Sequence, residues 1–189
     1  MERAKALAIT ENIFSLYERY GDADYIGEPV SQLEHMCQAA LLAEEEGFDE
    51  EVILAAFFHD IGHLAEFVMP VKQMDGVGVV DHEKIGSDYL RENGFSEKIC
   101  KLVQSHVQAK RYLTFKYPGY YEKLSPASKL TLTHQGGAMS RDEAIEFESD
   151  EWYSLYIKLR EWDDKAKEIN KPLPDLSKYK AMALGHLLT

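Results

Sequence analysis

The dipeptide His59-Asp60 is the feature of this sequence with the clearest chemical meaning. It follows an apolar run at 54–58 (LAAFF), and Gly62 and His63 come directly after it. A carboxylate at the end of so apolar a segment is costly to bury unless a positive charge compensates it. Imidazole and carboxylate ligands together favour Fe, Mn, Zn or Ni over Ca or Mg. The segment therefore predicts a transition-metal site, where Gly62 permits another helix to approach closely.

Seven histidines occur, at positions 35, 59, 63, 82, 106, 134 and 186. A single buried histidine is more often a hydrogen-bonded core residue than a metal ligand. However, His35, His59, His82 and His106 lie on four different predicted helices, each beside apolar core residues, and this joint pattern favours a shared site. His63, four residues after His59, is expected on the same helical face. The last two histidines lie outside this pattern and are expected to be structural or exposed.

Helix signals dominate the remaining sequence. Capping boxes begin at Ser31 and Ser140, and Asp49 and Ser96 are further N-cap residues. Helices are expected at about 31–47, 49–60, 81–93, from 96 through 106, from 140, at 150–167 and at 176–187, with loops at 21–29 and 68–80. No alternating strand of convincing length occurs. We predict a single all-α domain over 1–189, with the metal-site core at about 12–167.

The composition limits the classes of partner. The chain has 189 residues and a formal net charge of -12, which disfavours nucleic acid and anionic membranes as partners. The two cysteines, Cys37 and Cys100, lie in apparently helical, buried segments, so no disulfide framework is expected and the cytoplasm is the default compartment. The N-terminus lacks the apolar core of a signal peptide, and the longest apolar run, 52–58, is far too short to span a membrane.

The order of these residues resembles the ligand order H…HD…H…H…D of the HD-domain superfamily. The resemblance implies an HD-domain helical bundle with two metals and six ligands: His35, His59, Asp60, His82, His106 and Asp163. One metal would be held by the first three and Asp163, and the other by His82 and His106, with Asp60 bridging the two. Asp163 is preferred to Asp164 because it follows Trp162 as in the related motif.

Further segments are similar to one subgroup, the diiron oxygenases that cleave 2-amino-1-hydroxyethylphosphonate or its trimethylammonium analogue. These segments are 24–29, 32–35, 81–86, 106–113, 124–128, 135–137 and 158–163. The resemblance covers about 12–167. It implies a mixed-valent iron pair, Fe(II)/Fe(III), with O2 as cosubstrate. It further implies an oxidoreductase that cleaves the carbon–phosphorus bond of a 1-hydroxyphosphonate to give phosphate and glycine or glycine betaine.

The same resemblance implies roles for pocket residues. Tyr25 matches a tyrosine that occupies the oxygen-binding position of one iron, and Glu28 matches the carboxylate that engages the substrate ammonium. Together with Asp60 these are the expected catalytic residues. The expected phosphonate donors are His63, Lys110, Ser128 and Arg160. From the residues alone, Tyr25 could equally be a packed loop tyrosine and Glu28 a solvated acid, and each donor has a similar alternative.

The sequence leaves substrate and reaction open at two points. Val77 and Val80 stand where the aminoethyl-type enzyme carries larger aromatic residues, which favours a bulkier quaternary ammonium if these valines line the pocket. A metal-dependent HD phosphohydrolase acting on a nucleotide or other phosphate ester would use the same ligands without redox change. An oxygenase acting on an inositol-like polyol, or a degenerate HD module that only binds, are further alternatives. The complete ligand set argues against the last.

Overall fold

The fold is helical, as predicted. The structure, a computed structural model, describes residues 1–25, 27–74, 76 and 78–189, and in these residues it contains ten α-helices, one 3-10 helix and no strand. The elements are α1 (Arg3–Tyr20), α2 (Gln32–Glu45), α3 (Glu50–Phe58), η1 (Ile61–Phe67), α4 (His82–Glu92), α5 (Glu97–Lys116), α6 (Tyr120–Lys123), α7 (Pro126–His134), α8 (Arg141–Ser149), α9 (Tyr153–Lys165) and α10 (Leu176–Leu188).

Polar side chains begin the helices where the sequence predicts them. In the capping box of α2, the Glu34 amide donates to Ser31 Oγ at 3.2 Å and the Ser31 amide donates to Glu34 Oε2 at 2.7 Å. Asp49 caps α3 in the same way, accepting from the Val52 amide at 3.0 Å. The predicted capping box at Ser140 is also present. These caps satisfy backbone donors that the first helical turn leaves without partners.

The prediction of one helix through 49–60 is wrong at its end. α3 ends at Phe58, and the chain continues as the 3-10 helix η1 from Ile61. Asp60 leaves helical geometry with φ -104° and ψ 13°, so His63 does not lie on the same helical face as His59. Two residues after this turn, the backbone of Gly62 packs so closely on the His82 carbonyl that a Cβ there would overlap it. The close contact predicted for Gly62 is therefore present, and it joins η1 to the start of α4.

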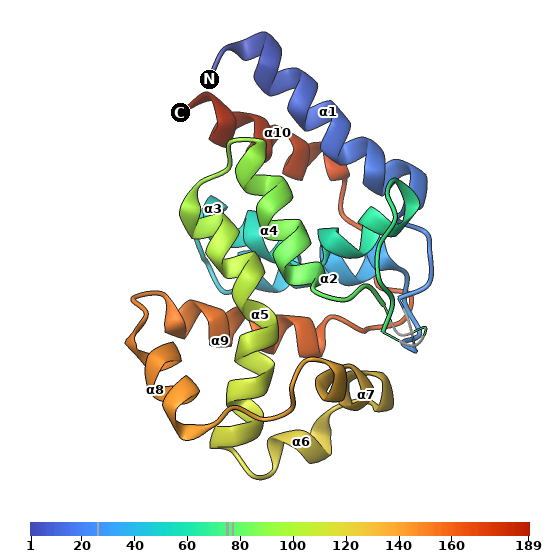
Figure 1. Ribbon diagram of the computed structural model, residues 1–189. Helices are drawn as coiled ribbons and strands as arrows, with labels where there is room; N and C mark the ends of the chain where they lie inside the picture. Colours follow the sequence, from blue (N-terminus) through green and yellow to red (C-terminus); the bar gives the residue numbers. More distant parts are fainter. Residues whose placement is uncertain (26, 75, 77) are drawn as a thin grey trace.

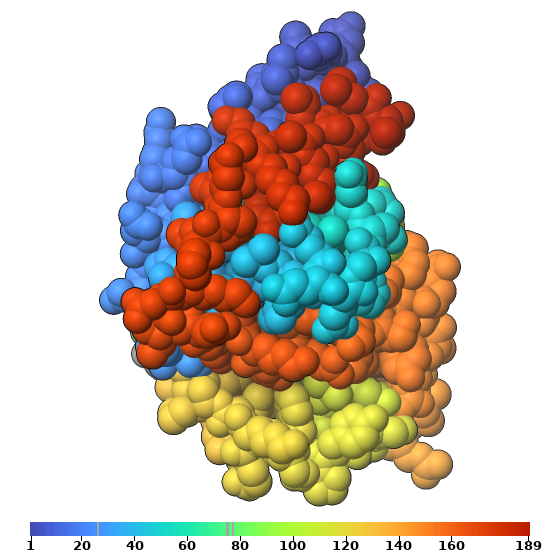
Figure 2. Space-filling view, turned by 180° about the vertical axis from the view of Figure 1, so that it is seen from behind, coloured from blue at the N-terminus to red at the C-terminus, as the bar shows by residue number. Residues whose placement is uncertain are grey.

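The core joins the two ends of the sequence. One cluster of buried apolar residues extends from Ala6 on α1 to Leu187 on α10, and α3 is buried along its length from Val52. Figure 1 shows α1 and α10 side by side at one end of the molecule, where both termini lie, and α6, α7 and α8 at the other end around the second half of α5. Figure 2 shows the segment between α9 and α10 running along the outside, past α3.

Two further expectations concern the chain as a whole. The sequence predicts no disulfide framework, and Cys37 and Cys100 are buried and free. Across the described ranges, none of the helices has both the length and the hydrophobicity needed to cross a bilayer. The predicted loop at 68–80 falls between η1 and α4, and of its described residues Gln73 and Val79 form an isolated bridge.

Candidate metal centre and adjoining pocket

The six predicted metal ligands meet in the interior of the molecule. They come from five places in the fold: His35 from α2, His59 and Asp60 from the two residues between α3 and η1, His82 from the first turn of α4, His106 from α5 and Asp163 from α9. All six are at most 4% exposed. Because all six polar side chains are removed from water, each needs a hydrogen-bond partner or an opposite charge within the site.

The four imidazoles form two pairs. Nε2 of His35 lies 3.0 Å from Nε2 of His59, and Nε2 of His82 lies 3.0 Å from Nε2 of His106. In every ring the other nitrogen, Nδ1, faces a backbone carbonyl: that of Ala166 at 2.9 Å, Ala56 at 2.8 Å, Val79 at 3.3 Å and Val103 at 2.7 Å. Since a carbonyl only accepts, Nδ1 carries the proton in each neutral ring, and Nε2 then presents a lone pair. Two lone pairs at 3.0 Å repel each other unless a cation lies between them.

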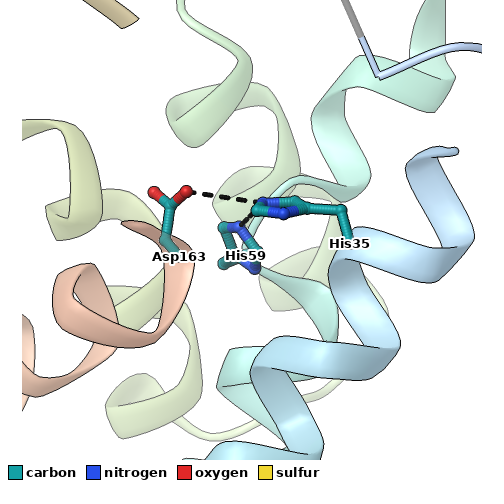
Figure 3. A group of neighbouring side chains, drawn as sticks. All are labelled: His35, His59 and Asp163. Atoms are coloured by element: carbon teal, nitrogen blue, oxygen red, sulfur yellow. Dashed lines mark hydrogen bonds and ion pairs between the residues drawn. The ribbon is translucent and has the colours of Figure 1, made fainter. Parts of the chain in front are cut away.

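Asp60 divides its two oxygens between the two pairs. Oδ2 lies 3.5 Å from Nε2 of His35 and 3.4 Å from that of His59, whereas Oδ1 lies 3.3 Å from Nε2 of both His82 and His106. Asp163 Oδ1 lies 3.4 Å from His35 Nε2. Figure 3 shows the His35 imidazole pointing to both His59 and Asp163. The donors therefore fall into two sets that share one carboxylate, and both sets fit a divalent transition metal.

The pKa values of Asp60 and His35 also indicate that the site favours positive charge. Burial alone would raise the pKa of Asp60, but the surrounding histidines, His59 first, hold it well below its usual range. Burial lowers the pKa of His35, yet its contacts with Asp163 and Asp60 raise it to about 9. The buried carboxylates therefore favour positive charge beside them.

His63 differs from the four paired histidines. Its Nδ1 accepts a hydrogen bond from the Val79 amide at 3.2 Å, so the neutral ring carries its proton on Nε2. Burial, and then the neighbouring His82, hold the pKa of His63 well below its usual range. A ligand atom of His63 lies within 4.8 Å of those of Asp60 and His82. Its tautomer nevertheless makes it a hydrogen-bond donor to an anion rather than a third ligand.

The backbone of one residue, Val79, sets the tautomers of His63 and His82. The Val79 carbonyl accepts from Nδ1 of His82, while the Val79 amide donates to Nδ1 of His63. The two rings stack with centroids 4.0 Å apart and an interplanar angle of 18°. The backbone at Val79 thus leaves Nε2 of the neutral His82 ring with a lone pair that could bind a metal, and leaves Nε2 of His63 with a proton to donate. Sequence reasoning did not identify Val79, because a backbone contact leaves no residue-type signal.

A pocket adjoins the metal ligands and contains the predicted phosphonate donors. Among its lining residues are five of the histidines and aspartates at the centre and five other predicted site residues: Asp60, His63, His82, His106 and Asp163, and Tyr25, Glu28, Lys110, Ser128 and Arg160. Lys110 is 3% exposed and donates from Nζ to Thr131 Oγ1 at 2.9 Å. Burial, and then the charge of Arg160, lower the pKa of Lys110 to about 7. Two ammonium N–H groups are left for a bound anion.

Arg160 already has many protein partners. Its Nη1 donates to Asp163 Oδ2 at 2.6 Å, its Nε to the Tyr120 hydroxyl at 3.0 Å, and its Nη2 to Ser128 Oγ at 3.4 Å and to Asp164. These four bonds use four of the five N–H groups of the guanidinium. A forked contact with a phosphonate would require one of them to exchange. The structure also separates the two candidate aspartates, since Asp163 faces His35 and Asp164 faces Arg160 and Tyr120.

The other two predicted catalytic residues also line the pocket. The Tyr25 ring stacks on His35 with centroids 3.9 Å apart and an angle of 13°. Burial, and then the charges of Asp60 and Asp163, raise the pKa of Tyr25 well above its usual range, so its hydroxyl stays protonated. Glu28 Oε1 accepts from Ser125 Oγ at 2.5 Å and from Lys167 Nζ at 2.6 Å.

The two valines expected near the substrate head group give no support for a bulkier head group. Val77 lies outside the described residues, and Val80, which is half-buried, is not one of the described residues that line the pocket. Lys167, in contrast, lines the pocket but was not predicted, because it stands at the edge of the recognised motifs and beyond the end of α9. Its ion pair with Glu28 bridges a long separation in sequence, which no local pattern reveals.

Comparison with known proteins agrees with this geometry. Residues 32–146 match the HD domain family, and this range covers more than half of the 189 residues. The chain belongs to the HD-domain family. The match includes five of the six predicted ligands, and only Asp163 lies beyond it.

Relatives of this HD-domain protein include two named oxygenases. It is 41% identical over 168 residues to the [1-hydroxy-2-(trimethylamino)ethyl]phosphonate dioxygenase (glycine-betaine-forming) of Leisingera caerulea, covering 88% of this chain and 84% of that one. It is 36% identical to the hydroxymethylphosphonate dioxygenase of Gimesia maris, covering 89% and 83%. It is also 47% identical to the uncharacterized protein L432 of Acanthamoeba polyphaga mimivirus, covering 93% and 80%. The resemblance to phosphonate-cleaving oxygenases is thereby confirmed over most of the chain.

Proposed function

We propose that this protein is a mixed-valent diiron oxygenase that uses O2 to cleave the carbon–phosphorus bond of a 1-hydroxyphosphonate. The overall reaction is RCH(OH)PO3H2 + O2 → RCO2H + H3PO4, in which the carbon is oxidised, dioxygen is reduced and the carbon–phosphorus bond is replaced by bonds to oxygen. The observation that carries the proposal is that two ligand sets sharing Asp60 open onto the same pocket as the cations of Lys110 and Arg160.

The proposed ligands are those that form the two sets. His35, His59 and Asp163 would hold one iron, His82 and His106 the other, and Asp60 would bridge them. The irons, when bound, supply the redox chemistry for oxidising the substrate with O2. The carbonyls that accept from Nδ1 of each histidine would fix the tautomer and the orientation of the rings, so that Nε2 faces the irons.

The anion site is the protein's own contribution to substrate binding. Lys110 would place a positive charge and two N–H donors on the phosphonate, and His63 would donate from Nε2. Ser128 and Arg160 would add hydrogen bonds from the α7 and α9 sides of the pocket. Tyr25, protonated and stacked on His35, would cover the first metal set until substrate enters. These groups orient the C1 carbon of the substrate toward the metals and exclude water from it.

The head group of the substrate is a separate question. The resemblance implies an aminoethyl- or trimethylammonioethyl-phosphonate, which would yield glycine or glycine betaine and would place its cation at Glu28. In the structure Glu28 binds Lys167. The proposal is therefore made for 1-hydroxyphosphonates as a class, with Glu28 as the residue of the pocket that faces the head group.

The deciding experiment measures oxygen uptake and phosphate release together. Protein reconstituted with iron should consume one O2 per phosphate released from 1-hydroxyphosphonates, and its electron paramagnetic resonance spectrum should show a mixed-valent iron pair. The same sample should release no phosphate under argon. Phosphate release from nucleotides or other phosphate esters with Mn or Zn, without oxygen uptake, would instead identify an HD phosphohydrolase and overturn the proposal.

A further inference from the structure

The ammonium group of Lys167 occupies the part of the pocket where a cationic head group is expected. Its Nζ lies 2.6 Å from Glu28 Oε1, and the two side chains are only 18% and 9% exposed. The same ammonium lies 6.0 Å from the centroid of the Tyr25 ring. All three residues line the pocket that adjoins the metal ligands. The carboxylate that would receive a substrate cation therefore already has a cation from the protein.

The backbone on both sides of Lys167 is fixed to α2. The carbonyl of Ala166 accepts from Nδ1 of His35 at 2.9 Å. The amide of Glu168 donates to Gln38 Oε1 at 2.9 Å, and its carbonyl accepts from Gln38 Nε2 at the same distance. Lys167 is thus anchored between a residue that orients a predicted metal ligand and one held by a pair of hydrogen bonds. Its side chain reaches Glu28 from a fixed base.

A cationic head group would have to displace Lys167 or share Glu28 with it. Displacement would leave a largely buried ammonium without its partner, and sharing would bring two like charges together; both cost free energy in a pocket shielded from water. A trimethylammonium group is the poorer competitor, because it has no N–H to donate to Glu28. It would also need aromatic faces, and Tyr25 is the non-histidine aromatic ring that the described residues contribute to the pocket lining, already facing Lys167.

A neutral head group meets neither obstacle. Gln32 also lines the pocket; it is 3% exposed, and its Oε1 has no hydrogen-bond partner among the described residues. A hydroxyl or amide of a neutral substrate could donate to this oxygen while the Glu28–Lys167 ion pair stays intact.

We infer that Lys167 is a specificity-determining residue that neutralises Glu28 and selects 1-hydroxyphosphonates whose head group carries no positive charge. The inference rests on the proposed function and refines its substrate class.

The test compares neutral and cationic phosphonates in kcat/KM and in binding. The neutral probes are hydroxymethylphosphonate and 1-hydroxyethylphosphonate, and the cationic probes are 2-amino-1-hydroxyethylphosphonate and its trimethylammonium analogue. Wild-type protein should prefer the neutral probes by about tenfold or more, the effect of one charge-assisted contact. Lys167→Met should move the cationic-to-neutral ratio toward the cationic probes by at least about tenfold, while Lys167→Arg should keep the wild-type ratio.

Lys178→Met is the matched control. Lys178 also forms a 2.6 Å ion pair with a glutamate, Glu44, but lies on the surface at α10, so its loss should leave the ratio unchanged. Wild-type preference for the cationic probes, or an equal loss for all four probes in Lys167→Met, would overturn the inference. If the wild-type protein consumes no oxygen with any probe, the proposed function fails. Calorimetric titration of the four phosphonates without oxygen then still decides the role of Lys167 from the ratio of dissociation constants.

Discussion

Arg160 donates from Nη1 to Oδ2 of Asp163 at 2.6 Å, while the other oxygen of Asp163 lies 3.4 Å from Nε2 of His35. A residue expected to bind the phosphonate is therefore bonded directly to a residue expected to bind metal. The guanidinium fixes which oxygen of Asp163 faces the metal set, because Oδ2 is already occupied. If both expected roles hold, anion binding and metal binding would be coupled through this one carboxylate.

Arg160→Lys should weaken both functions at once. A lysine cannot hold Asp163, Asp164 and Ser128 together as the guanidinium does. At roughly 1.5–3 kcal/mol for a charge-assisted hydrogen bond, we expect kcat/KM for a phosphonate to fall by about ten- to a hundredfold, with a lower iron content per chain. Arg91→Lys is the control, since Arg91 also binds two acids but is exposed. Full activity and full iron content in Arg160→Lys would contradict the coupling.

Asp60→Asn should remove both metals rather than one. The substitution keeps the size of the side chain but removes the charge that both imidazole pairs share. We expect elemental analysis to find well under one iron per chain, and no phosphonate-dependent oxygen uptake. A chelator should lower the melting temperature of the wild type, because a metal that binds only the folded state stabilises it, but not that of Asp60→Asn. Asp164→Asn should retain iron, since Asp164 faces Arg160; retention of two irons by Asp60→Asn would refute the bridging role.

The sequence was most informative about features that depend on the type of a single residue, such as helix caps and metal ligands. The capping residues Ser31, Asp49 and Ser140 begin helices as predicted, because a hydroxyl or carboxylate at an N-cap is a local requirement. The metal ligands were predicted by their type and order, and the structure brings them together. Asp163 rather than Asp164 faces His35.

The sequence was least informative about features that depend on backbone contacts or on pairs of residues far apart in the chain. The end of α3 at Phe58 was not predicted, and the tautomer of His63 depends on the Val79 amide. The ion pair of Glu28 with Lys167 joins residues far apart in the sequence. Such features leave no periodicity or motif, so they become visible only when the fold is known.

Gly62→Ala should disrupt the metal centre without changing any ligand. A Cβ at Gly62 would overlap the carbonyl of His82 and approach the backbone of Gly86, which would force α4 away from η1. We expect destabilisation of about 1–3 kcal/mol or more, as for other overpacked sites, together with a reduced metal content. Gly185→Ala is the matched control, because a Cβ there meets no atom within 4 Å and alanine favours a helix. Denaturant unfolding of both variants, followed by metal analysis, checks this; equal stabilities would contradict the close packing.

Lys110→Met should stabilise the free protein while abolishing phosphonate binding. Burial lowers the pKa of Lys110 from 10.5 to about 7, so the folded state disfavours the ammonium. Below pH 7 the residue is charged in both states and its desolvation cost is fully present; this cost disappears as the pH rises toward 10.5. At pH 7 the cost is on the order of 4 kcal/mol. We therefore expect the free energy of unfolding of the variant, measured with denaturant, to exceed that of the wild type by more at pH 7 than at pH 10. A less stable variant at pH 7 would show that the ammonium is not strained by burial.

The affinity of the wild-type protein for a phosphonate should fall as the pH rises above 7. Lys110 has a pKa of about 7 because burial and then Arg160 oppose its charge. A bound phosphonate dianion favours the charged form, so binding above this pKa requires uptake of a proton. Once the pH is well above 7, kcat/KM should fall by about tenfold per pH unit, mainly through KM.

Lys110→Arg separates this effect from ionisation of the substrate. An arginine stays protonated throughout the range, so its profile should lack the decline above pH 7, although its contacts differ and its maximum can be lower. Any dependence due to the phosphonate itself appears equally in both proteins and cancels in the ratio of the two profiles. Lys98→Arg is the surface control, because Lys98 pairs with Asp49 away from the pocket, and it should follow the wild-type profile. If the wild type and Lys110→Arg decline in parallel above pH 7, the titrating group is not Lys110.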